Sequence, residues 1–164
     1  MPKTKQSGKQ RGNTAGIGFG DSSSSPKKSS GFDALVEKLR GTKISRPKLR
    51  EEVFNQLYDG ATENPEIGKW YFFEYDPKFK DQLKEWDEYP LIRLLEKKGQ
   101  RLLGANLHYL NTRARLGAIN KKEVPTSTLH YYLPKNADNI FFEVPEDDIQ
   151  VLSQFPVEKF HRNR

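Results

Sequence analysis

Carboxylates and lysines near the middle of the chain are the first residues that could do chemistry. Asp87 precedes an apolar run, and Glu96, Lys97 and Lys98 follow it. A metal-dependent nuclease needs clustered carboxylates and a lysine to hold a divalent cation and activate water. Glu96, however, begins the polar loop of an expected hairpin, where charged side chains are solvated. A solvated loop is therefore the favoured interpretation, and a nuclease is the weaker alternative.

His108 is the second candidate, because it lies in an apolar segment beside Asn106 and Tyr109. As a general base it would need a nucleophile or a carboxylate within hydrogen-bond reach, and the sequence places none there. Strand alternation puts Asn106 and His108 on one face, and such a buried pair most often bonds loop backbone. We therefore expect no catalytic, metal-binding or cofactor-binding residue and no enzyme activity. The residues expected to organise loops are Asp76, Asp87, Asn106, His108 and Tyr109.

The basic side chains are concentrated at the N-terminus. The formal net charge is +6, and residues 1–30 contribute +5 of it through six basic side chains and one acidic one. These cations could bind phosphates while Trp70, Tyr71 or Trp86 stacks on bases. The aromatics have apolar neighbours, however, which favours core positions. The residues expected to contact a partner, protein or DNA, are Lys3, Lys5, Lys9, Arg11, Ile17, Phe19, Lys27 and Lys28.

The composition divides the 164 residues into three parts. Residues 1–30 are rich in Gly, Ser and Lys and cannot bury enough apolar surface to offset their ordering entropy, so we expect a basic tail that is disordered or ordered by a partner. Residues 31–60 read as a helical segment. Residues 61–164 are long enough for one compact α+β domain with its own core.

Helical spacing predicts three helices. The first runs from near Ser30, a plausible N-cap, to Gly41. The second covers about 46–58, with Ser45 as its cap. The third is short, over 111–120, with its two arginines, Arg113 and Arg115, expected to be exposed.

Apolar runs predict a small antiparallel, barrel-like sheet. A strand over 69–75 is ended by Asp76-Pro77, since proline cannot donate to a ladder. Runs at 91–95 and 102–110 flank a polar, glycine-containing loop and predict a β-hairpin. The two further expected strands are 129–133 and 140–144, followed by a short acidic helix over 146–152 and an apolar C-terminal stub.

Composition also excludes several classes of protein. The chain has no cysteine, so disulfides, thiolate catalysis and cysteine-ligated metals are excluded. No apolar run approaches the length of a membrane span, so we expect no membrane partner. We also expect no small-molecule substrate.

Three short motifs resemble a known protein family. The chain reads Phe73–Lys78 as FEYDPK, Trp86–Leu91 as WDEYPL and Gly104–Leu110 as GANLHYL. These are similar to the pattern FxYDPK, YDxxPL and GxNLHYL of small virion proteins in large contractile-tailed bacteriophages. The segment Phe155–Phe160 also resembles the closing motif of that family. The chain departs from the pattern at Trp86, where tyrosine is common, and at Ala105, where leucine or isoleucine is.

Members of that family are described as tail or baseplate components and also as proteins of packaged DNA ends. The resemblance therefore implies a structural subunit of a phage virion, in the tail or baseplate, that packs against other virion proteins. Assembly would occur in the host cytoplasm. The alternative is a DNA-binding protein that acts on packaged or terminal phage DNA through its basic tail.

The change in composition near Ser30 makes a prediction about digestion. Limited proteolysis of the isolated protein should remove residues 1 to about 30 first and leave a stable remainder, because extended chain is cleaved faster than packed chain. Gel electrophoresis and mass spectrometry identify the products. Rapid, uniform digestion of the whole chain would contradict it.

Overall fold

The computed structural model describes residues 31–121 and 123–163. The expected N-cap Ser30 lies outside these residues. So do all the expected tail contacts, Lys3, Lys5, Lys9, Arg11, Ile17, Phe19, Lys27 and Lys28.

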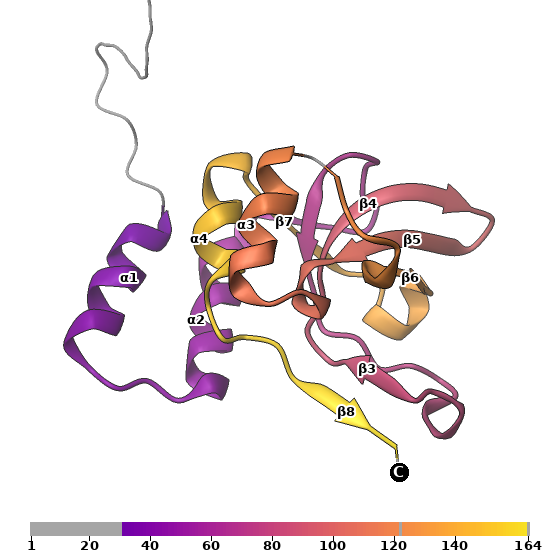
Figure 1. Ribbon diagram of the computed structural model, residues 1–164, viewed down its shortest axis with the longest axis horizontal. Helices are drawn as coiled ribbons and strands as arrows, with labels where there is room; N and C mark the ends of the chain where they lie inside the picture. Colours follow the sequence, from indigo (N-terminus) through magenta and orange to yellow (C-terminus); the bar gives the residue numbers. More distant parts are fainter. Residues whose placement is uncertain (1–30, 122, 164) are drawn as a thin grey trace, which may run out of the picture.

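In the part of the chain that the structure describes, eight strands form two antiparallel sheets. The main sheet has the strand order β1-β7-β2-β4-β5-β6, and β3 pairs with β8 in a separate ribbon. The strands are β1 Ala61–Thr62, β2 Trp70–Phe72, β3 Glu85–Asp87, β4 Leu91–Lys98, β5 Arg101–Asn106, β6 Leu129–Tyr132, β7 Phe141–Val144 and β8 Phe160–Arg162. In Figure 1 the helices lie to the left of strands β4, β5 and β6. This confirms the expected α+β class with an antiparallel sheet.

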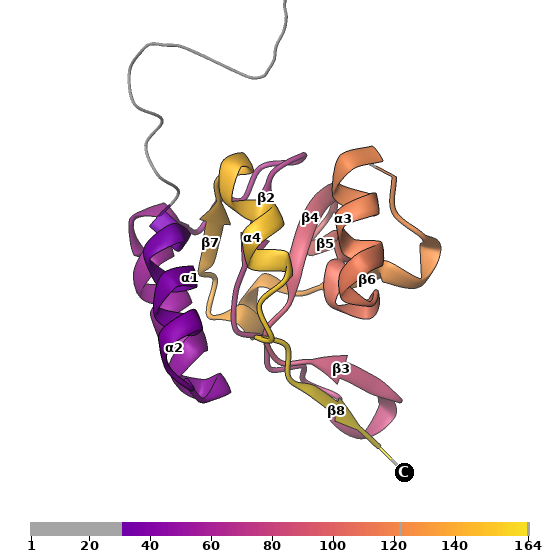
Figure 2. The ribbon, with the colours of Figure 1, turned by 60° about the vertical axis from the view of Figure 1, so that its left-hand side comes forward.

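The described residues form four α-helices beside the sheet: α1 Gly31–Gly41, α2 Arg46–Leu57, α3 Thr112–Lys121 and α4 Ile149–Ser153. The first three confirm the sequence prediction to within two residues, and the Ser45 side chain caps α2 by accepting from the backbone N–H of Lys48. Figure 2 shows α1 and α2 side by side at the left, α4 in the middle and α3 at the right. Among residues 31–121 and 123–163, no helix has the length and apolar character of a membrane span.

The main sheet has a core on each face, because successive side chains of β2 point to opposite sides. Trp70 and Phe72 pack in a cluster with the apolar faces of α1, α2 and α4. Tyr71 lies in a second cluster, where Phe73 meets Phe141 with ring centroids 4.9 Å apart. Ala137, in the connection between β6 and β7, packs in this second cluster as well.

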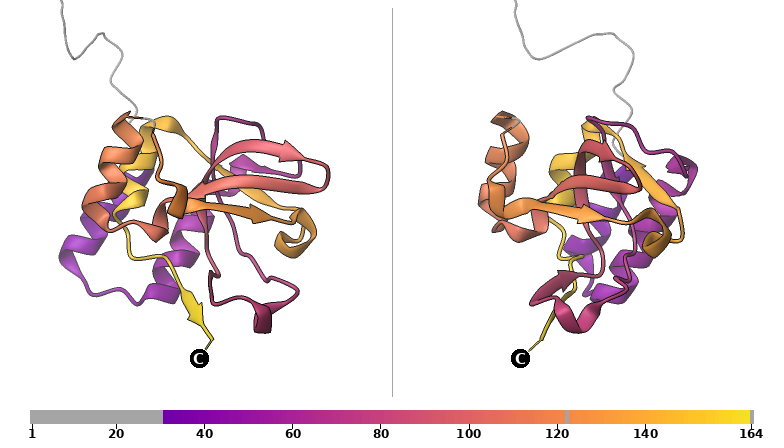
Figure 3. Two further views of the ribbon diagram at one scale, coloured as in Figure 1. Left: turned by 45° about the vertical axis from the view of Figure 1, so that its right-hand side comes forward. Right: turned by 90° about the vertical axis from the view of Figure 1, so that its right-hand side faces the viewer.

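The predicted β4–β5 hairpin is present, but its strands continue further than expected. They run to Lys98 and from Arg101, so that Gly99 and Gln100 alone make the turn. Gly99 has φ 61°, which glycine adopts without strain. The hairpin extends away from the helices (Figure 3). Gly104 has a different role, since a Cβ there would lie 2.6 Å from Cδ1 of Ile92.

The expected strand over 102–110 is wrong beyond Asn106. Residues Leu107–Tyr109 form a 3₁₀ turn, because the Asn106 side-chain oxygen accepts the backbone N–H of His108 at 3.0 Å. A local side-chain bond of this kind competes with ladder pairing.

Sequence reasoning missed the β3–β8 ribbon. Each strand has only three residues, and Trp86 pairs with His161, a partner far along the chain. The two strands lie side by side, below the main sheet in Figure 1. So short a segment carries no readable alternation, and long-range pairing alone defines it.

The expected exposure of Arg115 is also wrong. Its side chain is only 3% exposed. Its guanidinium donates to the carbonyls of Leu107, Leu110 and Ser153 at 3.0, 2.9 and 2.8 Å. It thereby joins the turn after β5 to the end of α4, and five fixed donors suit this use better than a lysine would.

Replacing Arg115 tests this joint. Arg115→Met should lower the free energy of unfolding by about 2–4 kcal/mol, because it leaves three carbonyls without their charged donor. Arg113→Met is the matched control on the same helix. Arg113 is exposed and forms no salt bridge within the described residues, so its loss should change stability by less than about 0.5 kcal/mol in urea denaturation. Equal effects would contradict the assignment.

Candidate functional site

A buried carboxylate joins three segments of the chain. Asp87 Oδ2 lies 2.7 Å from Nδ1 of His108 and accepts from the side-chain amide of Asn106 at 3.0 Å. Its Oδ1 accepts the backbone N–H groups of Tyr89 and Lys159 at 3.0 and 3.1 Å. We call Asp87, Asn106 and His108 the polar hub. It fixes the ribbon to the end of β5 and to the C-terminal segment.

Asn106 completes the hub from the other side. Its side-chain oxygen accepts the backbone N–H of Leu91 at 3.2 Å, in addition to that of His108. The hub thus sets where β4 begins and where β5 ends. The sequence prediction placed Asn106 and His108 together, and the structure adds Asp87 as the group between them.

The hub contains an Asp–His pair, which in other settings activates a nucleophile. Here the His108 and Asp87 side chains are 0% and 1% exposed, so no substrate reaches them. Burial alone would raise the pKa of Asp87, but the hydrogen bonds and charge of His108, with Asn106 and Tyr89, outweigh it and lower that pKa. The arrangement is that of a charged structural anchor.

The two other expected loop residues make their contacts outside the hub. Asp76 is exposed and pairs with Lys80 at 2.6 Å. Tyr109 stacks on His130, with ring centroids 4.2 Å apart. Burial raises the pKa of Tyr109 and lowers that of His130, so both rings are neutral near pH 7.

The residues considered for a nuclease are not assembled into a site. Asp87 is committed to the hub, whereas Glu96 is exposed near the hairpin tip and pairs weakly with Lys98 at 3.8 Å. Within residues 31–121 and 123–163, no group of three or more His, Asp or Glu side chains is placed to hold a metal ion.

A second feature lies beside the hub and is open to solvent. It is a cleft of about 290 Å³ between the segment leading into β3 and the outer strand β6. We call it the aromatic cleft, and its ring-bearing walls are Tyr75, Phe79, Trp86, Tyr109, His130, Tyr131 and Tyr132. Asp87 borders it as well, but its side chain is only 1% exposed, so the hub lies beneath the floor of the cleft and is not accessible from it.

Cations stand over the rings of the aromatic cleft. The Arg101 guanidinium lies 4.6 Å from the Tyr131 ring centroid, and the Lys78 ammonium lies 5.5 Å from that of Phe79. Neither cation forms a salt bridge within the described part of the chain. Of the aromatics considered for base stacking, Trp70 and Tyr71 are buried in the core. Trp86 lines the cleft.

Sequence reasoning did not identify Phe79 or Tyr131, and it named Arg101 only as one of several scattered arginines whose convergence the sequence could not show. A signal was present at Phe79, since an aromatic between Lys78 and Lys80 outside any strand has no core to enter. Nothing in the sequence joined it to Tyr131, because the two come together only through the sheet.

A polar depression of about 600 Å³ on the other side of Trp86 has the opposite character. It is lined by Glu74, Asp76, Glu88 and Asp138 together with Lys80, Lys135 and His161. Burial raises the pKa of Glu74, and the neighbouring carboxylates raise it further. An anion would be repelled there, so the aromatic cleft is the better candidate for a negatively charged ligand.

Comparison with known proteins gives one match. The family model described as phage T4 terminal DNA protecting protein matches residues 42–129. This segment includes α2, β2 to β5 and α3, and with them the polar hub and much of the aromatic cleft. No curated protein and no solved structure matches the chain.

The hub makes a prediction about stability and pH. Asp87→Asn should lower the free energy of unfolding by about 3–5 kcal/mol near pH 7, because the new amide has one accepting oxygen for four donors and lacks the buried charge that those donors stabilise. The folded-state pKa of Asp87 is lowered, so its contribution is present above the unfolded pKa near 4 and is lost as pH falls through the folded value.

Urea denaturation at several pH values tests the hub prediction. The difference in free energy of unfolding between the original protein and Asp87→Asn should become smaller as the pH is lowered below about 4. Asp81→Asn is the control, since Asp81 is exposed. A gap that stays constant down to pH 2 would rule out the charged anchor.

Proposed function

This chain belongs to the phage T4 terminal DNA protecting protein family, and from that membership we propose that it binds the ends of phage DNA. The single observation that carries the proposal is the match over residues 42–129. It supports the DNA-binding alternative better than the tail or baseplate role that the motifs put first. Packaged DNA as the ligand would place the protein in the virion.

We propose that protection comes from occupancy and not from catalysis. The one Asp–His pair of the hub is closed to substrates, as its side chains are almost wholly buried. The accessible feature beside it, the aromatic cleft, offers rings and unpaired cations, which bind nucleic acid without changing it. An enzyme acting at a DNA end would be blocked while the end is covered.

The charge distribution supports binding at a DNA end in preference to non-specific binding along the duplex. Residues 31–164 carry a net charge of only +1. Because non-specific duplex binding depends on neutralising many phosphates, so neutral a body would hold internal duplex weakly. Residues 1–30, with a net charge of +5, would add salt-sensitive attraction to phosphates.

An exonuclease assay tests the proposal. The full chain should slow digestion of a linear duplex from its ends, and it should bind open-ended duplex about ten-fold or more tightly than the same duplex with both ends closed by hairpin loops. Mobility shifts at about 150 mM salt measure the affinities.

Duplex length supplies the control for end binding. Affinity for an end does not change when the duplex is lengthened, whereas non-specific affinity rises with the number of sites. Equal binding to open and closed duplexes, or affinity that grows with length, would overturn the proposed function.

A further inference from the structure

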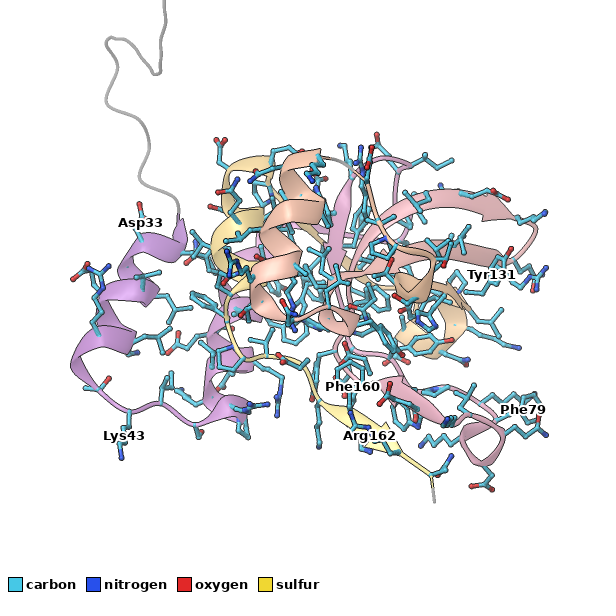
Figure 4. All side chains as sticks on the ribbon, in the orientation of Figure 1. Asp33, Lys43, Phe79, Tyr131, Phe160 and Arg162 are labelled. Carbon is cyan, nitrogen blue, oxygen red and sulfur yellow. The ribbon has the colours of Figure 1, made fainter. Side chains whose placement is uncertain are left out.

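The aromatic cleft concentrates apolar side chains that a folded protein usually buries. Within the described residues, six large hydrophobic side chains are exposed, and three of them line this cleft: Phe79 at 61%, Tyr131 at 46% and Leu83 at 37%. Tyr131 and Phe79 lie at the same end of the molecule, at the right in Figure 4, with Tyr131 above Phe79. An exposed apolar patch of this kind marks a binding surface.

The positions of the charges indicate the sign of the ligand. Lys78 and Arg101 stand beside the outermost rings. The lining contains two carboxylates, and neither presents a free charge to the cleft: Glu85 pairs with Arg162 at 2.5 Å, and the Asp87 side chain is buried within the hub. The cleft therefore combines an apolar floor with a positive rim, which complements a flat ring attached to an anionic backbone.

We propose that the aromatic cleft binds unpaired nucleotides at the DNA end, with bases stacked on Tyr131 and Phe79 and phosphates beside Arg101 and Lys78. This rests on the proposed function for the source of the nucleotides. In a paired duplex each base face is covered by its neighbours, so only a frayed or single-stranded end presents a free π-face.

The hairpin provides a path for the adjoining backbone. Arg101 pairs across the hairpin with Lys98, and Lys97 is the next residue on that strand. Both lysines are exposed, but they point to opposite faces of β4, and Lys98 shares the face of Arg101. A DNA strand that leaves the cleft toward the hairpin tip would pass Lys98, while a path across Trp86 would meet the carboxylates of the polar depression.

Removal of single exposed rings tests the stacking. The probe is a fluorescently labelled eight-nucleotide oligothymidine, with affinity measured by anisotropy on the full chain. Phe79→Ala and Tyr131→Ala should each weaken binding by about five- to one-hundred-fold, since one stacked base is lost. Tyr131→Phe keeps the ring and should bind as the original does.

Matched variants separate the cleft from general effects. Tyr58 is 71% exposed and does not line the cleft, so Tyr58→Ala should leave oligothymidine binding unchanged. Arg101→Gln should reduce the slope of log affinity against log salt by about 0.7, as one phosphate contact is lost, whereas Arg113→Gln should not. Tyr131→Ala should weaken binding without changing that slope. Unchanged melting temperatures show that all variants fold.

The outcomes distinguish this inference from the proposed function. If both ring variants bind oligothymidine like the original, or Tyr58→Ala weakens it equally, the inference is wrong. If they instead change the oligomeric state of the free chain in size-exclusion chromatography, the cleft binds protein and the inference is also wrong. If the affinity for duplex ends is the same with and without a single-stranded overhang, and the cleft variants do not change it, the inference is wrong and end binding stands. Cleft-dependent oligothymidine binding with no preference for open ends would overturn only the proposed function.

Discussion

The bond network of Asp87 is the constraint on which the rest of the structure depends. One buried carboxylate accepts hydrogen bonds from the side chains of His108 and Asn106 and from the backbone ahead of β8. β3 and β8 pair with each other in the ribbon, but neither strand pairs with β5 of the main sheet. Burying a charge costs desolvation free energy. A buried carboxylate is therefore tolerated only where N–H donors bind both of its oxygens, as they do at Asp87. The hub therefore fixes the ribbon in one position.

That position determines the shape of the aromatic cleft. Trp86 immediately precedes Asp87 on β3, and its ring stacks on His161 of β8 with centroids 4.2 Å apart. The hub places this strand opposite the edge strand β6, which carries Tyr131. Because the floor is anchored and its rim is exposed, the cleft can present rings to a ligand without the ordering cost of a mobile loop.

The distribution of charge and apolar surface has a consistent physical logic. The body is nearly neutral, and the cleft gathers half of the exposed large hydrophobic side chains found in the described residues. A protein that must find one terminus among long stretches of identical backbone gains selectivity when internal duplex is bound weakly. Family membership and this surface chemistry support the same proposal from independent directions.

The sequence by itself determined the elements whose signals are local. The Ser45 cap with a proline in the first turn set the start of α2, and the glycine between two apolar runs set the β4–β5 hairpin. Tertiary structure alone decided three things: the β3–β8 ribbon, the burial of Arg115, and the meeting of Phe79 with Tyr131 at one cleft. Each depends on partners distant in the chain. Periodicity and propensity act over a few residues, so they carry no information about which distant carbonyl, carboxylate or ring a side chain will meet.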